Sequence, residues 1–244
     1  LSAINLTTAT AAFVEAIREG RKGYVCVTGV HGVMESQKDP ALRTIHNRAF
    51  LCTPDGMPMV WMGKLAGYKE MDRVYGPDLM LEVFKVSRAN GIRHFLYGGA
   101  NGVAKILKQE LEKRFPGVEI VGTYEPPFRP LNEKEQSELQ DLVRQTKPHV
   151  IWVGLSTPKQ ERFMAEYISR LDTVLMVGVG AAFDFHAGRV KQAPRWMQRS
   201  GLEWFFRLCM EPRRLWKRYL SNNPRFAWRI ALQLSRLKKF PVIE

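Results

Sequence analysis

The feature that most constrains this chain is a regular alternation of short apolar runs with longer amphipathic segments. Six runs predict strands, at residues 24–28, 50–53, 94–97, 118–123, 150–154 and 173–178. The intervening segments predict helices at residues 39–47, 57–65, 77–90, 103–115, 132–147 and 158–170, after an amphipathic helix within residues 1–20. Short, nearly continuous apolar strands that alternate with helices are typical of a sheet buried on both faces. The pattern therefore predicts an α/β fold, a Rossmann-like parallel sheet with helices on both faces.

Positive charge is concentrated in the last quarter of the chain. Residues 189–244 carry 14 Lys and Arg against 3 Asp and Glu, whereas residues 1–188 carry 23 against 21. Four of the six tryptophans lie in the same quarter. We therefore predict an α/β catalytic domain at residues 1–188 and a basic, aromatic-rich helical appendage at residues 189–244.

Three interpretations of this appendage are open. Aromatic and basic residues together suit a membrane interface with anionic lipid, but a nucleic-acid groove uses the same residues. The third is a helical pair that packs its aromatic rings on the core and leaves its arginines in water. No apolar run reaches the length of about 18 residues that a membrane-spanning helix needs, and no cleavable signal peptide is expected.

The three cysteines, at positions 26, 52 and 209, are widely spaced and odd in number. They form neither a disulfide framework nor a pair at metal-ligand spacing. We expect all three to be buried, reduced side chains.

Small and polar residues follow several of the predicted strands, at residues 28–31, 53–56, 98–102, 154–160 and 178–180. Ligands of open parallel sheets bind beyond the carboxyl ends of the strands, so these segments are expected to converge on one site. Gly98, Gly99 and Gly102 could let backbone N–H groups approach a diphosphate at a helix N-terminus, or could form a plain tight turn. A nicotinamide-dependent oxidoreductase would use the same turn, with Glu119 as the acidic residue for the ribose.

Asp55 stands between a predicted strand and a predicted helix. It could serve as a general base that deprotonates a sugar hydroxyl, or it could be the N-cap of the helix at residue 57. The sequence contains no Asp-x-Asp pair and no His, Glu and Asp cluster at metal-ligand spacing. We therefore expect no metal and no other cofactor, and a departing diphosphate would be neutralised by backbone amides, helix dipoles and Arg or Lys.

Two further polar residues have alternative roles. Gln160 could hydrogen-bond sugar hydroxyls, because a neutral amide suits them better than a charge, or it could belong to an ordinary polar first helical turn. His186 is expected to be a structural, hydrogen-bonded residue and not a ligand.

Six motifs in order resemble the WecG/TagA/CpsF family of bacterial glycosyltransferases (glycosyltransferase family 26). They are Thr-Pro-Asp-Gly-Met-Pro-Met-Val-Trp (53–61), Arg-Val-Tyr-Gly-Pro-Asp-Leu-Met (73–80), Tyr-Gly-Gly-Ala-Asn-Gly-Val-Ala (97–104), Val-Gly-Leu-Ser-Thr-Pro-Lys-Gln-Glu (153–161), Val-Gly-Val-Gly-Ala-Ala-Phe-Asp (177–184), and Gly-Leu-Glu-Trp-Phe-Phe-Arg-Leu with Glu-Pro-Arg-Arg-Leu (201–215). The resemblance spans nearly the whole chain.

The resemblance implies inverting, metal-independent transfer from a UDP-sugar to an undecaprenyl-diphosphate-linked saccharide in bacterial surface polysaccharide biosynthesis. It implies a peripheral protein on the cytoplasmic face of the plasma membrane, with an anionic membrane surface and no nucleic acid as partner.

By the same resemblance, each candidate site residue has an expected role. Asp55 looks like the catalytic base, Thr28 and Gln160 like donor or acceptor contacts, and Asp184 like a nucleotide contact. Arg73 lies in a segment that the family uses near its pocket. The appendage residues expected to hold the acceptor diphosphate and reach the membrane are Arg207, Arg214 and Lys217.

The chain departs from the family pattern at one place. Wall-teichoic members carry an Asn two residues after the Thr of the first strand end, whereas this chain has Val30 followed by His31. The donor sugar is therefore open among glucose, glucuronic acid and a mannosamine derivative. His31 is the second candidate for the base.

Overall fold

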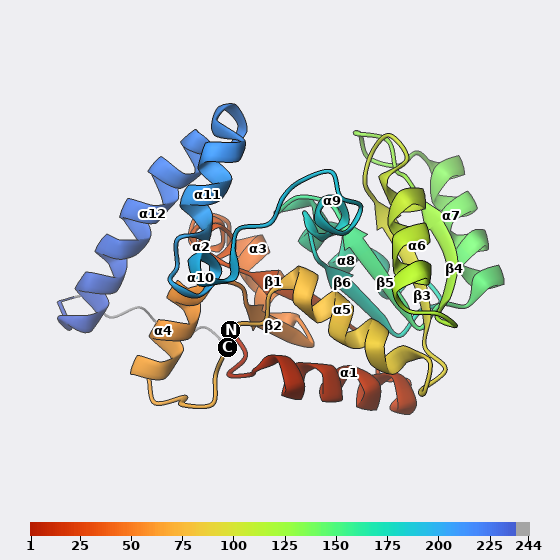
Figure 1. Ribbon diagram of the computed structural model, residues 1–244, viewed down its shortest axis with the longest axis horizontal. Helices are drawn as coiled ribbons and strands as arrows, with labels where there is room; N and C mark the ends of the chain where they lie inside the picture. Colours follow the sequence, from red (N-terminus) through yellow and green to blue (C-terminus); the bar gives the residue numbers. More distant parts are fainter. Residues whose placement is uncertain (238–244) are drawn as a thin grey trace.

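The computed structural model describes residues 1–237, in which six strands form one parallel sheet (Figure 1). The strand order is β2-β1-β6-β5-β3-β4, and every neighbouring pair is parallel. The strands are β1 (Gly23–Thr28), β2 (Leu51–Pro54), β3 (Arg93–Gly98), β4 (Glu119–Tyr124), β5 (Val150–Gly154) and β6 (Leu175–Gly178). The predicted α/β fold with a parallel sheet is confirmed.

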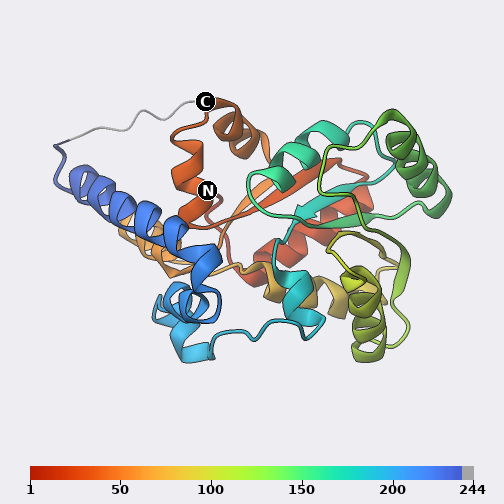
Figure 2. The same ribbon diagram turned by 90° about the horizontal axis from the view of Figure 1, so that it is seen from above.

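Helices cover both faces of this sheet (Figure 2). The first apolar layer contains α1 (Leu6–Glu19), α5 (Gly76–Ser87), α6 (Val103–Arg114) and α9 (Ala182–His186). The second contains α3 (Pro40–Arg48), α7 (Glu133–Thr146) and α8 (Lys159–Tyr167). Alternate residues of one strand supply the two layers: Val25 and Val27 of β1 join the first, and Tyr24 and Cys26 join the second. Burial on both faces explains why the strands read as continuous apolar runs.

Local signals account for several helix starts. Asn132 accepts from the backbone N–H of Glu135 at 2.9 Å, and the Glu135 side chain accepts from the Asn132 N–H at 2.9 Å. This reciprocal capping box fixes the start of α7, as the spacing of the two residues indicates. The amphipathic helix expected near the N-terminus is α1, which buries Phe13.

Two short helices among residues 1–188 were not predicted, α2 and α9. α2 (Val30–Ser36) begins two residues after β1 ends, within the segment that we had assigned to a strand end. It is short and contains Gly32, so its own propensity is weak. Packing stabilises it instead, since α12 (Pro212–Leu234) lies against it.

The appendage folds as three helices, α10 (Arg195–Arg199), α11 (Glu203–Met210) and α12. In Figure 1, α12 extends at the β2 end of the sheet, on the side of α2 and α4 (Met57–Leu65). No helix among residues 1–237 is both long and apolar enough to cross a membrane. The predicted domain boundary at residue 188 stays a prediction. The last residues of the predicted appendage, 238–244, lie outside the described residues.

Two cysteines behave as expected and one does not. Cys26 and Cys52 are buried and unpaired, whereas Cys209 is exposed. The expectation that all three are buried is therefore wrong for Cys209, because α11 has no buried residue of its own.

Candidate active site

Asp55 lies at the carboxyl end of β2, immediately before α4. The N-cap of α4 is Gly56, whose φ is 101°, and the helix receives no side-chain cap hydrogen bond. The alternative interpretation of Asp55 as a helix cap is therefore wrong. The Asp55 N–H donates to the carbonyl of Thr28 at 3.0 Å, which ties the end of β2 to the end of β1. The Asp55 side chain is 33% exposed and free of any capping duty.

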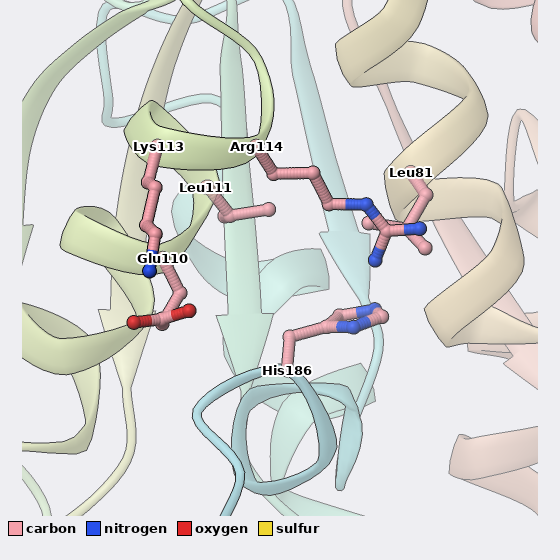
Figure 3. Close-up of a pocket in the computed structure, with 6 residues that line it drawn as sticks. All are labelled: Leu81, Glu110, Leu111, Lys113, Arg114 and His186. Carbon is pink, nitrogen blue, oxygen red and sulfur yellow. The ribbon is translucent and has the colours of Figure 1, made fainter.

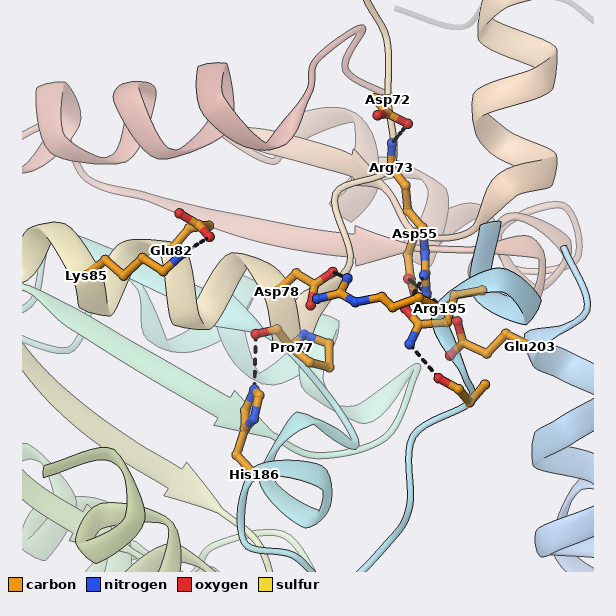
Figure 4. A network of polar contacts seen from close by, with 12 residues as sticks. Asp55, Asp72, Arg73, Pro77, Asp78, Glu82, Lys85, His186, Arg195 and Glu203 are labelled. Carbon is orange, nitrogen blue, oxygen red and sulfur yellow. Dashed lines mark hydrogen bonds and ion pairs between the residues drawn. The ribbon is translucent and has the colours of Figure 1, made fainter. Parts of the chain in front are cut away.

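Arg73 links this strand end to the appendage (Figure 4). Its guanidinium Nη2 lies 3.9 Å from Asp55 Oδ1 and forms a close ion pair with Glu203 of α11. Its Nη1 donates to Gln198 Oε1 of α10 at 2.9 Å. The guanidinium also stacks over the Tyr75 ring, 4.0 Å from its centroid. Four neighbours thus hold a cation whose side chain is only 9% exposed.

The surroundings of Asp55 raise its pKa to about 6. Burial is the main cause, because removal from water disfavours the ionised carboxylate. The charges of Arg73 and Arg207 oppose this shift, and those of Glu203 and Asp78 add to it. A carboxyl group that titrates near neutral pH is suited to accept a proton during a reaction.

Other carboxylates near Asp55 are already paired. Glu203 is bound to Arg73, and Asp78 accepts from Arg195 Nη1 at 2.9 Å. The 3.9 Å between Arg73 and Asp55 is outside hydrogen-bond range. Asp55 is therefore the carboxylate of this group with the greatest capacity to accept a hydrogen bond from a ligand.

Two buried guanidinium nitrogens lack protein partners. Among the described residues, Nε of Arg73 and Nε of Arg207 have no hydrogen-bond acceptor. The Arg207 guanidinium lies over the Phe185 ring, 5.7 Å from its centroid. A buried donor without an acceptor is unfavourable by about 1–3 kcal/mol, so both nitrogens are suited to an anionic ligand. The substrate contacts expected of Arg73 and Arg207 stay predictions.

The other predicted cations of the appendage lie further out. Arg214 is 59% exposed and donates to Glu211 at 2.6 Å. Lys217 is exposed and lies over the Trp216 ring, 5.5 Å from its centroid. The inward face of α12 is instead marked by the buried Leu215 and Asn222.

Arg218 is a residue that sequence reasoning missed. It lies between Leu215 and Asn222 at helical spacing, so it shares the inward face of α12. Its charge helps to lower the pKa of His31 on α2, so it lies near that side chain. The 3.6-residue period could have identified it, but the face that turns inward was unknown before α12 was seen against α2.

His31 lies at the interface of α2 and α12. Its Nδ1 is 2.9 Å from Asn222 Nδ2 and 4.0 Å from Glu35 Oε1. Burial and the charge of Arg218 lower its pKa to about 4, so the ring is neutral near pH 7. As a base it is weaker than Asp55, and one ring nitrogen already faces the appendage.

Thr28 and Gln160 are two predicted site residues that are buried. Thr28 is 3% exposed, and its hydroxyl accepts from the Cys52 thiol at 3.3 Å. Gln160 is also 3% exposed; its Nε2 donates to Glu161 Oε1 at 3.1 Å and its Oε1 accepts from the Gly180 N–H at 3.1 Å. Both side chains are therefore hydrogen-bonded within the protein, and their predicted ligand contacts stay predictions.

The glycine turn also lies at the carboxyl ends of the strands, but several strands away from Asp55. β3 is four strands from β2, which is about 19 Å at the usual strand spacing. Gly98, Gly99 and Gly102 all have positive φ, at 123°, 73° and 80°. The Gly99 N–H donates to the Gly154 carbonyl at 3.3 Å, and the Gly102 N–H donates to Glu125 at 3.2 Å. Their role in diphosphate binding stays a prediction.

The nicotinamide alternative fails on geometry. Glu119 pairs with Arg93 at the first residues of β4 and β3, whereas Gly98 ends β3. Glu119 therefore lies at the opposite edge of the sheet from the glycine turn and is not in place to bind a ribose there.

Asp184 and His186 both belong to α9. Burial raises the pKa of Asp184, while Arg214, Arg189 and Arg207 lower it, so this carboxylate faces the basic appendage. His186 Nε2 lies 3.0 Å from the Pro77 carbonyl, so the expectation that this residue is hydrogen-bonded is confirmed. A hollow of about 280 Å³ beside His186, between α5, α6 and α9, is lined by no predicted substrate residue (Figure 3). In the described residues, no group of three or more His, Cys, Asp or Glu is arranged to hold a metal.

Comparison with known proteins identifies the family to which this chain is similar. The model of the Glycosyl transferase WecG/TagA/CpsF family matches residues 1–240. An N-acetylglucosaminyldiphosphoundecaprenol N-acetyl-beta-D-mannosaminyltransferase of Bacillus subtilis (strain 168) is 32% identical over 187 residues, 77% of this chain and 70% of the relative. An enzyme of the same name from Staphylococcus aureus (strain MW2) is 27% identical over 195 residues, 79% of this chain and 73% of the relative.

Proposed function

Because the chain belongs to the WecG/TagA/CpsF family and is a glycosyltransferase, we propose that it moves a sugar from a UDP-sugar to an undecaprenyl-diphosphate-linked saccharide. We further propose that the reaction inverts the anomeric carbon, needs no metal ion and takes place at the cytoplasmic face of a membrane. The activity for which these relatives are named makes N-acetylmannosamine the first donor sugar to test and a lipid-linked N-acetylglucosamine the first acceptor.

The observation that carries this proposal is Asp55, a carboxylate with a pKa of about 6 beside two buried guanidinium groups. In the proposed reaction, the acceptor hydroxyl donates its proton to Asp55 as its oxygen attacks the anomeric carbon. The bond to UDP breaks on the opposite side, so the configuration inverts in one displacement. The neighbouring Glu203 and Asp78 are already paired with arginines, so Asp55 is the carboxylate left to react. A single carboxylate that acts as a base suits an inverting mechanism better than a mechanism that needs two carboxylates.

The charge that develops on the departing diphosphate needs positive groups. Arg73 and Arg207 supply two cations with unpartnered Nε donors near Asp55, and Arg214 and Arg218 add charge from α12. Charge-assisted hydrogen bonds of this kind stabilise a developing anion most strongly where water is excluded. They give the proposal a source of electrostatic stabilisation within the chain itself.

The appendage also supports the proposed membrane location. Trp196, Trp216 and Trp228 are 65%, 47% and 65% exposed. The alternative in which the aromatic rings pack on the core is therefore wrong for these three rings. Exposed rings among arginines are typical of a surface that enters the headgroup region of a bilayer.

The direct test incubates the full chain with a panel of UDP-sugars and a short-chain lipid-diphosphate N-acetylglucosamine. Mass spectrometry should find one acceptor extended by one sugar, and NMR should show an inverted anomeric centre. Activity should persist in EDTA. No extended product with any donor would refute the proposed substrate pair, and retention of configuration or a strict divalent-ion requirement would refute the mechanism.

A further inference from the structure

The arginine beside Asp55 is shared between the α/β domain and the appendage. Arg73 lies before α5, yet Glu203 of α11 and Gln198 of α10 bind its two terminal nitrogens. Figure 4 shows Glu203 and Asp55 on the two sides of this guanidinium. Asp55 Oδ1 lies 3.9 Å from Arg73 Nη2, which is too far for a hydrogen bond.

The two carboxylates compete for one cation. A guanidinium offers a planar set of N–H donors that prefers to bind a carboxylate through two hydrogen bonds. Glu203 is 17% exposed, so its ion pair is more strongly shielded from water than a surface pair would be. The stacking of Arg73 on Tyr75 and its bond to Gln198 further fix the guanidinium on the side of the appendage.

We propose that Glu203 is a positioning residue that holds Arg73 away from Asp55, so that Asp55 keeps its oxygens available to the acceptor hydroxyl. This inference rests on the proposed function, in which Asp55 takes the proton of that hydroxyl. It assigns the appendage a part in setting the strength of the base, in addition to its proposed contact with the acceptor.

Removal of the Glu203 charge leads to a definite rearrangement. Arg73 keeps its charge but loses its closest partner, and the nearest remaining carboxylate is Asp55. An aspartate that is hydrogen-bonded to an arginine usually has a pKa lowered by about 1–3 units. Asp55 would then be a weaker base, and its oxygens would already be occupied by Arg73.

The charged groups around Asp55 show how its pKa would change if Glu203 were removed. Glu203 and Asp78 raise its pKa, and Arg73 and Arg207 lower it. Two tyrosines also lie close, and burial raises the pKa of Tyr75 and of Tyr219, so both stay neutral near pH 7. Loss of Glu203 removes one raising charge and strengthens one lowering charge, so both effects lower the pKa of Asp55.

The decisive measurement is the pKa of Asp55 itself. It is obtained from a pH titration monitored by carbon NMR, with the full chain labelled at its aspartate carboxyl groups. Asp55→Asn identifies the signal. Glu203→Gln should lower this pKa by at least about 1 unit, and Glu203→Ala should act in the same direction. Glu203→Asp keeps the charge and should stay nearer to the wild type. Glu166→Gln on α8, which breaks an exposed pair with Arg170, is the matched control and should change nothing.

Turnover gives the second readout. In Glu203→Gln the low-pH limb of the rate profile should move down in pH with the NMR value, while kcat at pH 8 falls about 3- to 10-fold because the base is weaker. If Glu203 only fastened the appendage to the domain, the Asp55 pKa would stay unchanged in both variants as thermal stability fell. That result, or a raised pKa, would overturn the proposal. Absence of transfer by the wild type would instead refute the proposed function and leave the titration result standing.

Discussion

Asp55 illustrates how burial and neighbouring charges set the chemistry of one side chain. Its pKa of about 6 results mainly from burial, which disfavours the ionised form and raises the pKa. Two nearby arginines stabilise the ionised form and reduce this increase. The sequence identified the residue and its possible role as a base. It could not identify Glu203, since that residue comes from a helix about 150 positions later in the chain.

Asp55→Asn should reduce turnover by about 100- to 10,000-fold, the usual contribution of a general base. The amide has nearly the same size and cannot accept the proton, so UDP affinity should change little. Steady-state kinetics and calorimetric titration with UDP measure the two effects, and Asp141→Asn on the exposed face of α7 is the control. Turnover close to the wild-type rate would exclude Asp55 as the base.

The same substitution should stabilise the fold at neutral pH. The folded pKa of about 6 lies above the value of about 3.9 for an unfolded aspartate, so the folded state loses its proton less readily. Stability attributable to Asp55 is therefore greatest below pH 4 and is lost as pH rises through 6. Asp55→Asn should raise Tm by about 6–12 °C at pH 7.5 and leave it unchanged at pH 4, measured by calorimetry. An equal gain at both pH values would contradict the buried, raised pKa.

At the scale of elements, the ends of the strands are packed closely enough that only glycine fits at some positions. A Cβ at Gly98 would lie 2.7 Å from the Gly154 carbonyl oxygen of β5, and its φ of 123° is unfavourable for other residues. A Cβ at Gly102 would meet no heavy atom within 4 Å, although its φ is 80°. Within the glycine motif that suggested phosphate binding, Gly98 is thus required by the close approach of β3 and β5.

Gly98→Ala should lower the free energy of unfolding by more than about 3 kcal/mol, because both the backbone and the neighbouring strand must shift. Gly102→Ala should cost only about 1 kcal/mol, since the strain there is conformational alone. Urea denaturation of the two variants gives the comparison. Equal losses would show that the contact between β3 and β5 is not the cause.

At the scale of the whole molecule, exposed apolar side chains gather at one end. Along α12, Leu220, Trp228 and Leu234 are 63%, 65% and 57% exposed. On the nearby α4, Trp61 and Leu65 are 46% and 68% exposed, and Figures 1 and 2 place both helices at this end of the molecule. Exposed basic residues also lie on α12, at Arg213, Arg214, Lys217 and Arg225. Apolar and basic residues together are expected on a surface that meets anionic lipid.

Leu220→Ser with Trp228→Ser should weaken binding to phosphatidylglycerol-containing vesicles at least about tenfold, because each buried apolar side chain contributes about 1.5–3 kcal/mol. Phe128→Ser is the matched control, since Phe128 is 89% exposed but follows β4 at the other edge of the sheet. Cosedimentation measures both, and 0.5 M salt should weaken the wild-type binding. Equal binding by the double variant and the wild type would exclude this face of α12.

The sequence by itself determined the sheet, most of the helices, the family and the identity of Asp55, because strand burial, helix caps and strand-end motifs are local patterns. Only the tertiary structure decided which face of α12 turns inward, and so that Arg218 lies near His31 while Lys217 is exposed. It also decided that Glu203 and Gln198 hold Arg73, and that Thr28 and Gln160 are bonded internally. Such contacts join residues far apart in the chain, and their geometry depends on how α12 packs against α2 and α11, which no local pattern specifies.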